Sequence, residues 1–319
     1  MDKKDEKILK ELLLNSREST NKLAKKVNIS REVANYRINK LKYTFIKDFT
    51  TLIDFKKLGY KKYGCFIQFK GISLEQEEII IKYLINHNSI MYLSPIIGKW
   101  NVAFDILAKN EKELKDITND ITEKCKKYLD KFILTGTGMH EENFPTKFVG
   151  EEYKLTKLKK QKKQKEYTID EMDKKIIKIL SNDSRISYVE LAKKLNLTPN
   201  SIKYRIKNLE KSKIILGYTI SIDFKKLGYE VYNLQLKLDI LENKKLYSFL
   251  RQHPKVIYYY NYLGHENWDL DIGLIISNSL ELRKFIIDIR KNFGEIIKLY
   301  DIYILTEIFK NYYPKNIFK

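Results

Sequence analysis

The sequence predicts an α+β protein with two helix-turn-helix domains, of the three-helix or winged type, and two βαββαβ sandwiches of the ferredoxin-like (ACT-like) type. Three observations carry this prediction. The 319-residue chain consists of two similar halves, each copy opens with apolar residues at helical spacing, and each continues with alternating strand and helix patterns. The length also exceeds that of most single domains.

The duplication is visible as long identities between the two halves. Residues 53–60 read IDFKKLGY and recur unchanged at 222–229. Such self-similarity indicates a tandem repeat. The domains that we predict from it are a helix-turn-helix domain at 1–45 (motif about 20–39), a regulatory or assembly domain at 46–150, a Lys-rich linker at 151–167, a second helix-turn-helix domain at 168–216 (motif about 188–207) and a second regulatory domain at 217–319.

Positive charge gathers in three segments of the chain. Of the net +20, residues 1–43 supply +6, residues 168–213 supply +5 and residues 151–166 supply +4. A basic segment followed by a nearly neutral one in each copy predicts a module that binds a polyanion, followed by an assembly or sensing module. The Lys-rich linker reads either as a solvated tether or as a basic tether that also touches phosphate.

Composition also bounds the location of the protein. No run of about 18 apolar residues is present, and the first six residues lack the apolar stretch of a signal peptide. Cys65 and Cys125 are the only cysteines, which excludes a disulfide framework and fits a reducing compartment. We therefore expect a cytoplasmic protein with no membrane partner.

Each copy begins with the pattern of three short helices. Ser30 and Thr198 suit the N-caps of the third helices, and Pro199 suits a first helical position. A brief turn between the last two helices defines a helix-turn-helix. The apolar stripes are Ile8, Leu9, Leu12, Leu13, then Leu23, Ala24, Val27, then Ala34, Ile38, Leu41 in the first copy, and Ile176, Ile177, Leu180, then Leu191, Ala192, Leu195, then Ile202, Ile206, Leu209 in the second.

The third helix of each copy is the predicted DNA-reading helix, which in this motif lies in the major groove. Its polar face carries donors that match base edges and phosphates. The alternative for either copy alone is a three-helix bundle with an ordinary solvated basic face. The candidate DNA-binding residues are Arg31, Asn35, Tyr36, Arg37, Asn39 and Lys40 in the first copy, and Asn200, Ser201, Lys203, Tyr204, Arg205 and Lys207 in the second.

Arginine is scarce, with eight residues among the 61 basic ones, and four of the eight lie at matched positions. Arg17 matches Arg185, and Arg37 matches Arg205. The planar fork of Arg, which Lys cannot copy, suits both phosphate contact and structural bridges. Both roles stay open for these four residues.

The remainder of each copy alternates strands and helices in the order βαββαβ. In the first copy the strands lie near 63–70, 90–97, 102–108 and 131–137, and the helices carry Ile79, Ile80, Tyr83 and Leu84, then Leu114, Ile117, Ile121, Cys125 and Tyr128. In the second they lie near 231–239, 256–263, 268–276 and 296–308, with one helix ending at Gln252 and the other carrying Leu282, Phe285, Ile286, Ile289 and Phe293.

These residues resemble the Lrp/AsnC (feast/famine) family of transcription regulators over most of each copy. The resemblance rests on Asp173, Ile176, Leu180, DSRIS at 183–187, ELA at 190–192, LTP at 197–199, Arg205-Ile206, Leu209 and ILGY at 215–218, running into Ile222-Asp223 and Leu227-Gly228. It implies a sequence-specific regulator of double-stranded DNA, without a cofactor, whose sandwiches pair through their sheets and respond to a small effector such as an amino acid. We expect the two sandwiches to pair within the chain as a pseudo-dimer, with homo-oligomers as a further implication.

The resemblance also implies an effector loop of pattern Gly-x-(aromatic)-Asp between the two central strands. The first copy offers Gly98, Trp100 and Asn101, with Asn in place of Asp, so this site is a candidate for a vestigial one. The second offers Gly264, Trp268 and Asp269 in a loop two residues longer. The alternative is a plain β-turn with a packing Trp.

No catalytic or metal site is predicted. The chain has no phosphate-binding P-loop and no Gly-x-Ser-x-Gly elbow, and its four His lack partners at zinc spacing. We therefore expect no enzymatic activity. Two alternative functions stay open: an enzyme of the sirohaem decarboxylase type, which shares the fold, and an architectural DNA-binding protein of low specificity.

Overall fold

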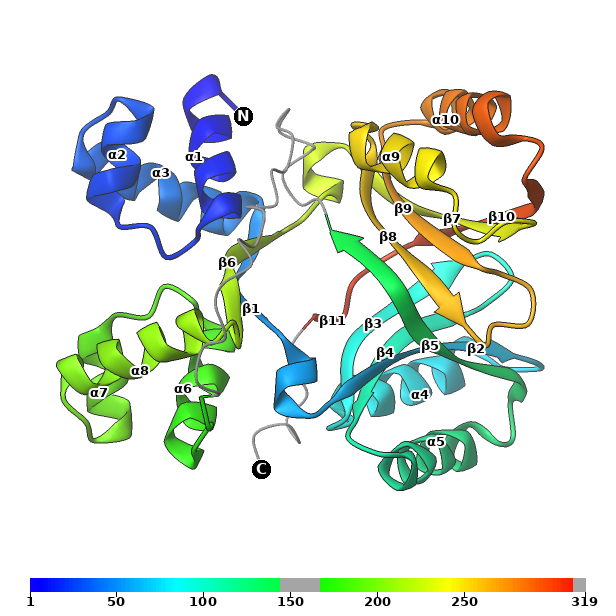
Figure 1. Ribbon diagram of the computed structural model, residues 1–319, viewed down its shortest axis with the longest axis horizontal. Helices are drawn as coiled ribbons and strands as arrows, with labels where there is room; N and C mark the ends of the chain where they lie inside the picture. The colour runs from blue at the N-terminus through cyan, green and yellow to red at the C-terminus, as the bar shows by residue number, and fades with distance from the viewer. Residues whose placement is uncertain (144–166, 312–319) are drawn as a thin grey trace. The chain divides into compact units, whose positions relative to one another are not determined.

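The computed structural model describes residues 1–143 and 167–311 (Figure 1). Residues 151–166 of the predicted linker and the end of the second regulatory domain lie outside the described residues. The described chain forms two compact units: unit 1 holds the helices and strand that open each copy, and unit 2 holds the two sandwiches. The mixed α+β class and both predicted kinds of domain are confirmed.

Unit 1 contains the same elements from each copy. They are α1 (Lys3–Leu14), α2 (Thr20–Val27), α3 (Arg31–Thr44), β1 (Ile46–Ile53) and the 3-10 turn η1 (Phe55–Leu58), then α6 (Glu171–Asn182), α7 (Tyr188–Leu195), α8 (Pro199–Lys211), β6 (Ile215–Ile222) and η3 (Lys225–Leu227). All the apolar stripe residues that the sequence assigned to these helices are buried except Leu195, which is half-buried.

The helix boundaries of unit 1 follow from its capping residues. The Ser30 side chain accepts the Val33 amide, and that of Thr198 accepts the Ser201 amide with Pro199 directly after it. Asn28 and Asn196, at φ 57° and 54°, end α2 and α7 in the left-handed conformation that Asn tolerates. These caps fix the turn between the second and third helix of each copy.

The two copies meet in unit 1 through an antiparallel pair of strands. β1 pairs with β6 from Ile46 opposite Ile222 to Ile53 opposite Ile215. β1 and β6 group by contact with the helices of unit 1 and not with the sandwiches. The connections into them differ, because α3 runs on to Thr44, whereas α8 ends at Lys211 and a tight turn follows with Lys213 at φ 60°.

Unit 2 contains the order βαββαβ from each copy, as predicted. The elements are β2 (Lys61–Phe69), α4 (Leu74–Asn86), β3 (Ile90–Ile97), β4 (Val102–Ala108), α5 (Glu111–Cys125) and β5 (Leu129–Asn143), then β7 (Glu230–Leu238), α9 (Lys244–Gln252), β8 (Val256–Leu263), β9 (Leu270–Ile276), α10 (Ser279–Phe293), β10 (Ile297–Leu305) and the short β11 (Lys310–Asn311).

The strands of unit 2 join into one sheet of order β10-β7-β9-β8-β5-β2-β4-β3-β11, and β10 also pairs with β3. The first copy contributes β3-β4-β2-β5 and the second β8-β9-β7-β10. The copies therefore touch at two seams, β5–β8 and β3–β10, and in each seam the last strand of one βαββαβ sandwich pairs with the second strand of the other; β11 also pairs with β3. α4 and α5 cover the sheet on one side of unit 2, and α9 and α10 cover it on the other (Figure 1).

The apolar core of the first sandwich lies between its helices and its sheet. It gathers Ile80 and Leu84 of α4, Ile117 and Ile121 of α5, and Phe104 of β4. One residue of the predicted stripe departs from this pattern. Ile79 was placed on the same side as Ile80 and Leu84, but it is 58% exposed, because it lies about 100° around the helix from Ile80.

Candidate nucleic-acid interface

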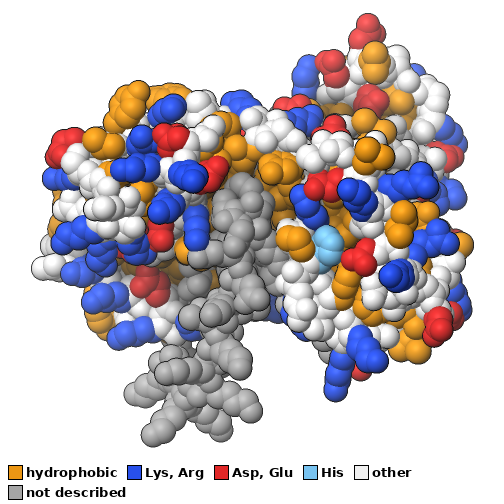
Figure 2. Space-filling model, turned by 90° about the horizontal axis from the view of Figure 1, so that it is seen from above, with side chains coloured by type: hydrophobic (Ala, Val, Ile, Leu, Met, Phe, Trp, Pro, Cys, Tyr) orange, Lys and Arg blue, Asp and Glu red, His pale blue; other side chains and the backbone are white. Residues whose placement is uncertain are grey.

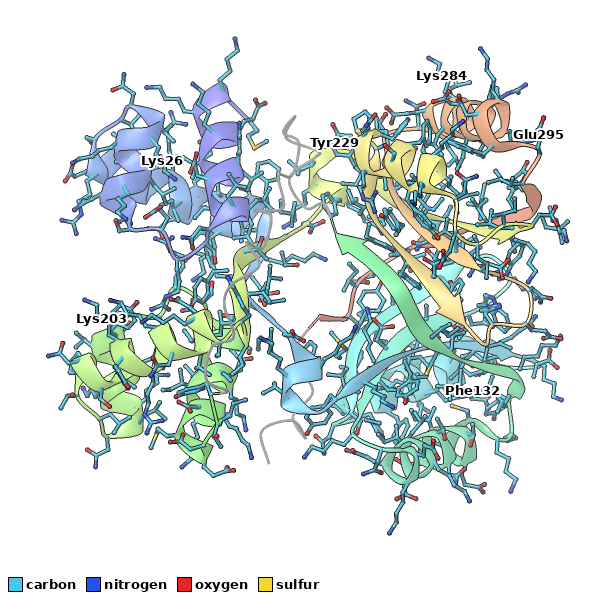
Figure 3. The ribbon with its side chains drawn as sticks, in the orientation of Figure 1. Lys26, Phe132, Lys203, Tyr229, Lys284 and Glu295 are labelled. Atoms are coloured by element: carbon cyan, nitrogen blue, oxygen red, sulfur yellow. The ribbon has the colours of Figure 1, made fainter. Side chains whose placement is uncertain are left out.

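The two predicted reading helices expose matching polar faces. Arg31, Asn35, Tyr36, Asn39 and Lys40 are exposed on α3. On α8, Asn200, Lys203, Tyr204 and Lys207 are exposed and Ser201 is half-buried. Lys and Arg side chains predominate over the helical unit seen in Figure 2, and Figure 3 marks Lys203 on α8.

Two tyrosines are the largest apolar groups that these faces present to solvent. Tyr36 and Tyr204 are each 69% exposed. A packing role would bury such rings, so the fold does not require tyrosine here. A ring with a hydroxyl at its tip suits contact with a base edge or with the sugar-phosphate backbone.

Arg37 lies at the edge of its reading helix and bridges back to the first helix. One guanidinium nitrogen lies 2.6 Å from an Asp2 oxygen and 2.6 Å from an Asp5 oxygen. Asp5 is only 2% exposed, so the bridge neutralises a buried carboxylate. The hydrogen bonds to Asp2 and Asp5 raise the pKa of Arg37, and the hydrogen bond from Arg37 is the main cause that lowers the pKa of Asp2 to about 2.

The second copy repeats this bridge. Arg205 contacts Asp170 at 2.7 Å and the buried Asp173 at 2.9 Å. Hydrogen bonds to the same two carboxylates raise the pKa of Arg205. Of the two roles left open by the sequence, the structure therefore contains the intradomain bridge for both Arg37 and Arg205, and direct DNA contact by either stays a prediction.

The other matched arginines join the two copies. The Arg17 guanidinium donates to the carbonyl of Ser184 at 2.6 Å and to that of Ile186 at 3.0 Å. Arg185 returns the contact by donating to the Ser16 carbonyl at 2.6 Å and the Glu18 carbonyl at 3.2 Å. We call these four hydrogen bonds the reciprocal brace. Hydrogen bonds with a charged donor are among the stronger ones in proteins.

Buried hydroxyl groups complete the contact between the copies in unit 1. The Ser16 and Ser184 hydroxyls lie 2.6 Å apart, and neither residue is exposed. Thr51 on β1 donates to the Leu180 carbonyl at 2.7 Å, and Thr219 on β6 donates to the Leu13 carbonyl at 2.8 Å. Each copy thus supplies the same groups to the other, and the positions of α3 and α8 within unit 1 are coupled.

In each predicted effector loop, the polar residue accepts a hydrogen bond from a backbone amide of the adjacent strand. The Asn101 side chain accepts the Phe69 amide at 2.8 Å, and that of Asp269 accepts the Leu238 amide at 2.8 Å. Asn and Asp do the same structural work here. Gly98 approaches β10 so closely that an added Cβ would lie 3.0 Å from the Tyr303 Cβ, which accounts for glycine at this position.

Three ring nitrogens near these loops are buried without a hydrogen-bond partner in the described part of the chain. They belong to Trp100, Trp268 and His265. Burial, followed by the nearby Lys99 charge, lowers the pKa of His265 to about 4, so its ring is neutral near pH 7. Its Nδ1 accepts the amides of Asn267 and Trp268, which leaves the proton on Nε2.

A polar cluster that the sequence did not suggest lies inside the sheet of unit 2. Asp271 on β9 is fully buried and accepts hydrogen bonds from Tyr262 at 2.5 Å, from Tyr303 at 2.8 Å and from Asn233. Gln235 donates to the Tyr262 hydroxyl at 2.7 Å. Burial raises the pKa of Asp271 to about 6. The available signal was Asn233 and Gln235, two apart on one face of β7, together with Asp271 on the otherwise apolar β9.

The described residues contain neither a metal-binding cluster nor a membrane-spanning helix. No group of three or more His, Cys, Asp or Glu side chains lies together as a metal site would require. None of the described helices has the length and hydropathy needed to cross a bilayer.

Comparison with known proteins matches both opening segments to DNA-binding families. Residues 1–42 match the AsnC-type helix-turn-helix domain, and residues 169–215 match the winged helix-turn-helix DNA-binding model. An HTH-type transcriptional regulator of Pyrococcus abyssi is 33% identical over 119 residues, which cover 37% of this chain and 80% of the relative. The HTH-type transcriptional regulator LrpA of Pyrococcus horikoshii is 40% identical over 91 residues, covering 26% of this chain and 64% of LrpA.

These matches define a helix-turn-helix regulator of transcription that binds DNA. The chain belongs to the Lrp/AsnC family. Among solved structures, the sirohaem decarboxylase NirDL has a similar fold, with a TM-score of 0.68 and 14% identity, over 99% of this chain and 96% of that one. At that identity the likeness concerns the fold alone.

Proposed function

We propose that the two helix-turn-helix domains of unit 1 bind one asymmetric site on double-stranded DNA together, with α3 and α8 in adjacent turns of the major groove. The observation that carries this proposal is the reciprocal brace, which couples two exposed polar helix faces within one unit. Family members with this motif place their reading helices about one helical turn apart. The two faces differ in sequence, so the preferred site is not a palindrome.

The contacts that we propose fall into two groups. Arg31, Asn35, Tyr36, Asn39 and Lys40 read one half of the site. Their counterparts on α8 are Asn200, Ser201, Lys203, Tyr204 and Lys207, and these read the other half. α8 carries no acidic residue between Thr198 and Leu209, whereas α3 has Glu32, so the second half of the site contributes more of the affinity.

The test is a pair of substitutions on α8. We expect Lys203→Ala with Lys207→Ala to weaken binding to a site selected from random double-stranded DNA, and to reduce the salt slope of the logarithm of the binding constant by about 2. Lys244→Ala with Lys245→Ala, on the exposed start of α9, is the matched control. An unchanged affinity and slope for the α8 variant would overturn the proposal.

The two sandwiches form, in this proposal, a pseudo-dimer within one chain. The seams β5–β8 and β3–β10 support it, because each pairs the last strand of one sandwich with the second strand of the other. The effector loops remain candidates for a regulatory site, with the unpaired Trp100 and Trp268 N–H groups as donors. These are the only two tryptophans, so a fluorescence titration with amino acids reads both loops directly.

A second candidate function, catalysis of the sirohaem decarboxylase type, is favoured by the shared fold. A substrate with many carboxylates needs cationic side chains around it. Among the described residues no Lys or Arg is buried, and the buried charged group inside unit 2 is Asp271. We therefore propose a cytoplasmic regulator that is not an enzyme. Haem-like absorbance that co-purifies with the protein would contradict this.

A further inference from the structure

The outer helical layers of unit 2 carry opposite charge. α4 and α5 of the first copy hold eight acidic and four basic residues, whereas α9 and α10 of the second hold seven basic and two acidic residues. The two layers lie on opposite sides of the unit (Figure 1). Both copies build the same fold, so packing alone does not demand this difference.

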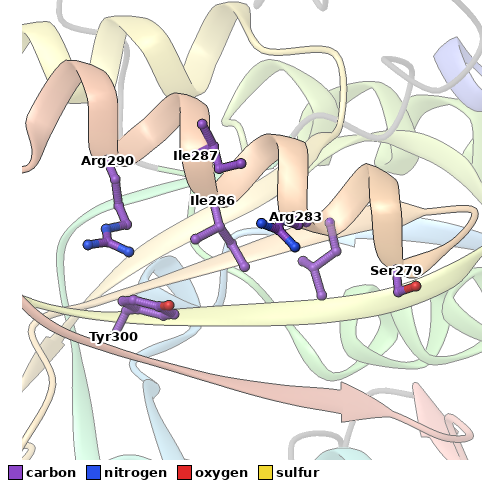
Figure 4. A pocket seen from close by; sticks show the side chains of 7 residues that line it. Ser279, Arg283, Ile286, Ile287, Arg290 and Tyr300 are labelled. Carbon is purple, nitrogen blue, oxygen red and sulfur yellow. The ribbon is translucent and has the colours of Figure 1, made fainter.

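The basic layer contains a groove between α10 and β10 with a volume of about 300 Å³ (Figure 4). Arg283 and Arg290 both line it, seven residues or two helical turns apart on one face of α10. Ile287 between them is 54% exposed, and Tyr300 below is 42% exposed. The lining residues are Ser279, Leu282, Arg283, Ile286, Ile287, Arg290 and Tyr300.

Both guanidinium groups in the groove are available to an anion. Arg283 and Arg290 form no ion pair with any residue in the described ranges, and Arg290 lies 5.9 Å from the centre of the Tyr300 ring. In a chain that uses Lys as its ordinary cation, two unpaired arginines beside an exposed isoleucine form a surface that is both apolar and basic.

The corresponding face of the first copy has no such groove residues. Lys115, Thr118, Asn119 and Thr122 of α5 stand where the second copy has Arg283, Ile286, Ile287 and Arg290. The Thr118 and Thr122 hydroxyls donate to backbone carbonyls one turn earlier, at 3.0 and 2.8 Å. The apolar, arginine-lined character therefore belongs to the second copy alone.

The acidic layer presents the complementary surface. On α4, Leu74 is 81% exposed and Ile79 is 58% exposed, although neither is needed in the core. Glu75 and Glu78 are exposed beside them. Lys82 lies 3.4 Å from Glu78, but both side chains are about 70% exposed, so this pair is weak and easily exchanged. The face of α4 is thus apolar and acidic.

We propose that the occupant of the α10–β10 groove is α4 of a second copy of this chain. Ile79 then covers Ile287, and Glu75 and Glu78 face Arg283 and Arg290. Because the two surfaces lie on opposite sides of one molecule, the contact joins different surfaces of successive copies in a head-to-tail manner. A nucleic acid fits the groove less well, because a phosphodiester backbone leaves the exposed isoleucine uncovered.

The predicted contact is small and charged, which sets the form of the test. One helix against one groove buries less than a standard interface, so we expect association in the micromolar range that weakens as salt is added. Sedimentation velocity of the full chain without DNA measures this. We expect Arg283→Glu with Arg290→Glu, and separately Glu75→Lys with Glu78→Lys, to weaken self-association about tenfold each.

Mixing the two variants gives the sharpest result. Each variant keeps one intact surface, so in an equimolar mixture the α4 face of the arginine variant can bind the groove of the glutamate variant. The two altered surfaces also carry opposite charge, so we expect the mixture to associate as the wild type does. All four substitutions in one chain should restore association, because the charges are exchanged. Lys115→Glu with Thr122→Glu on α5 is the matched control and should change nothing.

Three results would overturn the proposal. The wild-type chain could keep a single mass at every concentration and salt level, the charge variants could associate as the wild type does, or their mixture could associate no better than either alone. If the arginine variant instead loses DNA binding while self-association persists, the groove serves nucleic acid. None of these results depends on the reading helices, so the DNA-binding proposal fails or stands separately.

Discussion

In unit 1 the main contacts made by one copy are repeated by matched residues of the other, whereas in unit 2 the copies have diverged. Arg17 and Arg185 exchange the same hydrogen bonds, and Arg37 and Arg205 form the same bridges. In unit 2, the loop between the central strands differs in length by two residues. Ala103 stands where the second copy has the buried Asp271.

The difference indicates what each unit has to do. In the complex that we propose, the two helix-turn-helix domains read one DNA duplex and must hold a fixed spacing, which a reciprocal set of contacts would supply with the same residues from each side. The sandwiches have no such requirement. One copy can then carry a polar interior or a basic outer layer that the other lacks, without loss of the shared sheet.

The largest expected effect comes from breaking the symmetry of unit 1. Arg17→Ala with Arg185→Ala removes four hydrogen bonds from charged donors, at about 3 kcal/mol for each arginine. The two helix-turn-helix domains then move independently, which lowers the effective concentration of one domain at its half of the site once the other domain is bound. We expect the affinity for the selected site to fall roughly a hundredfold. Binding measurements should be paired with hydrogen exchange at the β1–β6 amides, whose protection should also fall.

Lysine replacements sharpen this result. Arg17→Lys with Arg185→Lys keeps the charge but lacks the fork that reaches two carbonyls, so we expect little rescue. Lys244→Ala with Lys245→Ala on α9 is the control for the loss of two positive charges by the alanine variant. If the alanine variant binds the site as tightly as the wild type, the reciprocal brace does not position the two helix-turn-helix domains.

The second effect concerns the divergent interior of unit 2. The folded pKa of Asp271, about 6, lies above its ordinary value of 3.8, so folding disfavours the ionised form. Its contribution to stability is therefore greatest at low pH and is lost as pH rises through about 6, at a cost on the order of 3 kcal/mol by pH 7. Asp271→Asn should remove this dependence and raise the melting temperature at pH 7.

The difference in melting temperature between the wild type and Asp271→Asn, measured against pH, separates the titration of Asp271 from that of the other acidic residues. The melting temperature of wild type minus that of Asp271→Asn should fall between pH 4 and pH 7 and level off above it. A flat difference across that range would show that Asp271 does not titrate where its burial indicates.

The sequence was enough to predict the element order, because repeats, caps and periodicity are local. Ser30, Thr198 and Pro199 occupy the helix-cap positions assigned to them. The brace was not predictable, because Arg17 contacts residues 167 and 169 positions away. The charge pattern indicated that Arg17 and Arg185 mattered as a pair, but their partners are backbone carbonyls, which every sequence supplies.

The buried cluster around Asp271 escaped prediction for a related reason. The run Tyr258-Tyr259-Tyr260 lies in the strand predicted near 256–263, which β8 confirms. That Tyr262 and Tyr303, 41 residues apart, donate to one carboxylate depends on strand order. Strand order follows from the whole sheet and not from a local pattern.

The smallest expected effect tests the difference between the two reading helices themselves. Glu32 is fully exposed in the first turn of α3, where its charge would repel the phosphates of DNA bound as we propose. We expect Glu32→Gln to strengthen binding to the first half of the site about threefold. Glu123→Gln on α5 is the matched loss of one exposed acid. The measurement compares the full site with sites in which either half is scrambled, and only the site that keeps the first half intact should gain. Equal gain at both halves would mean that Glu32 acts through the net charge of unit 1 and not through its place on the reading helix.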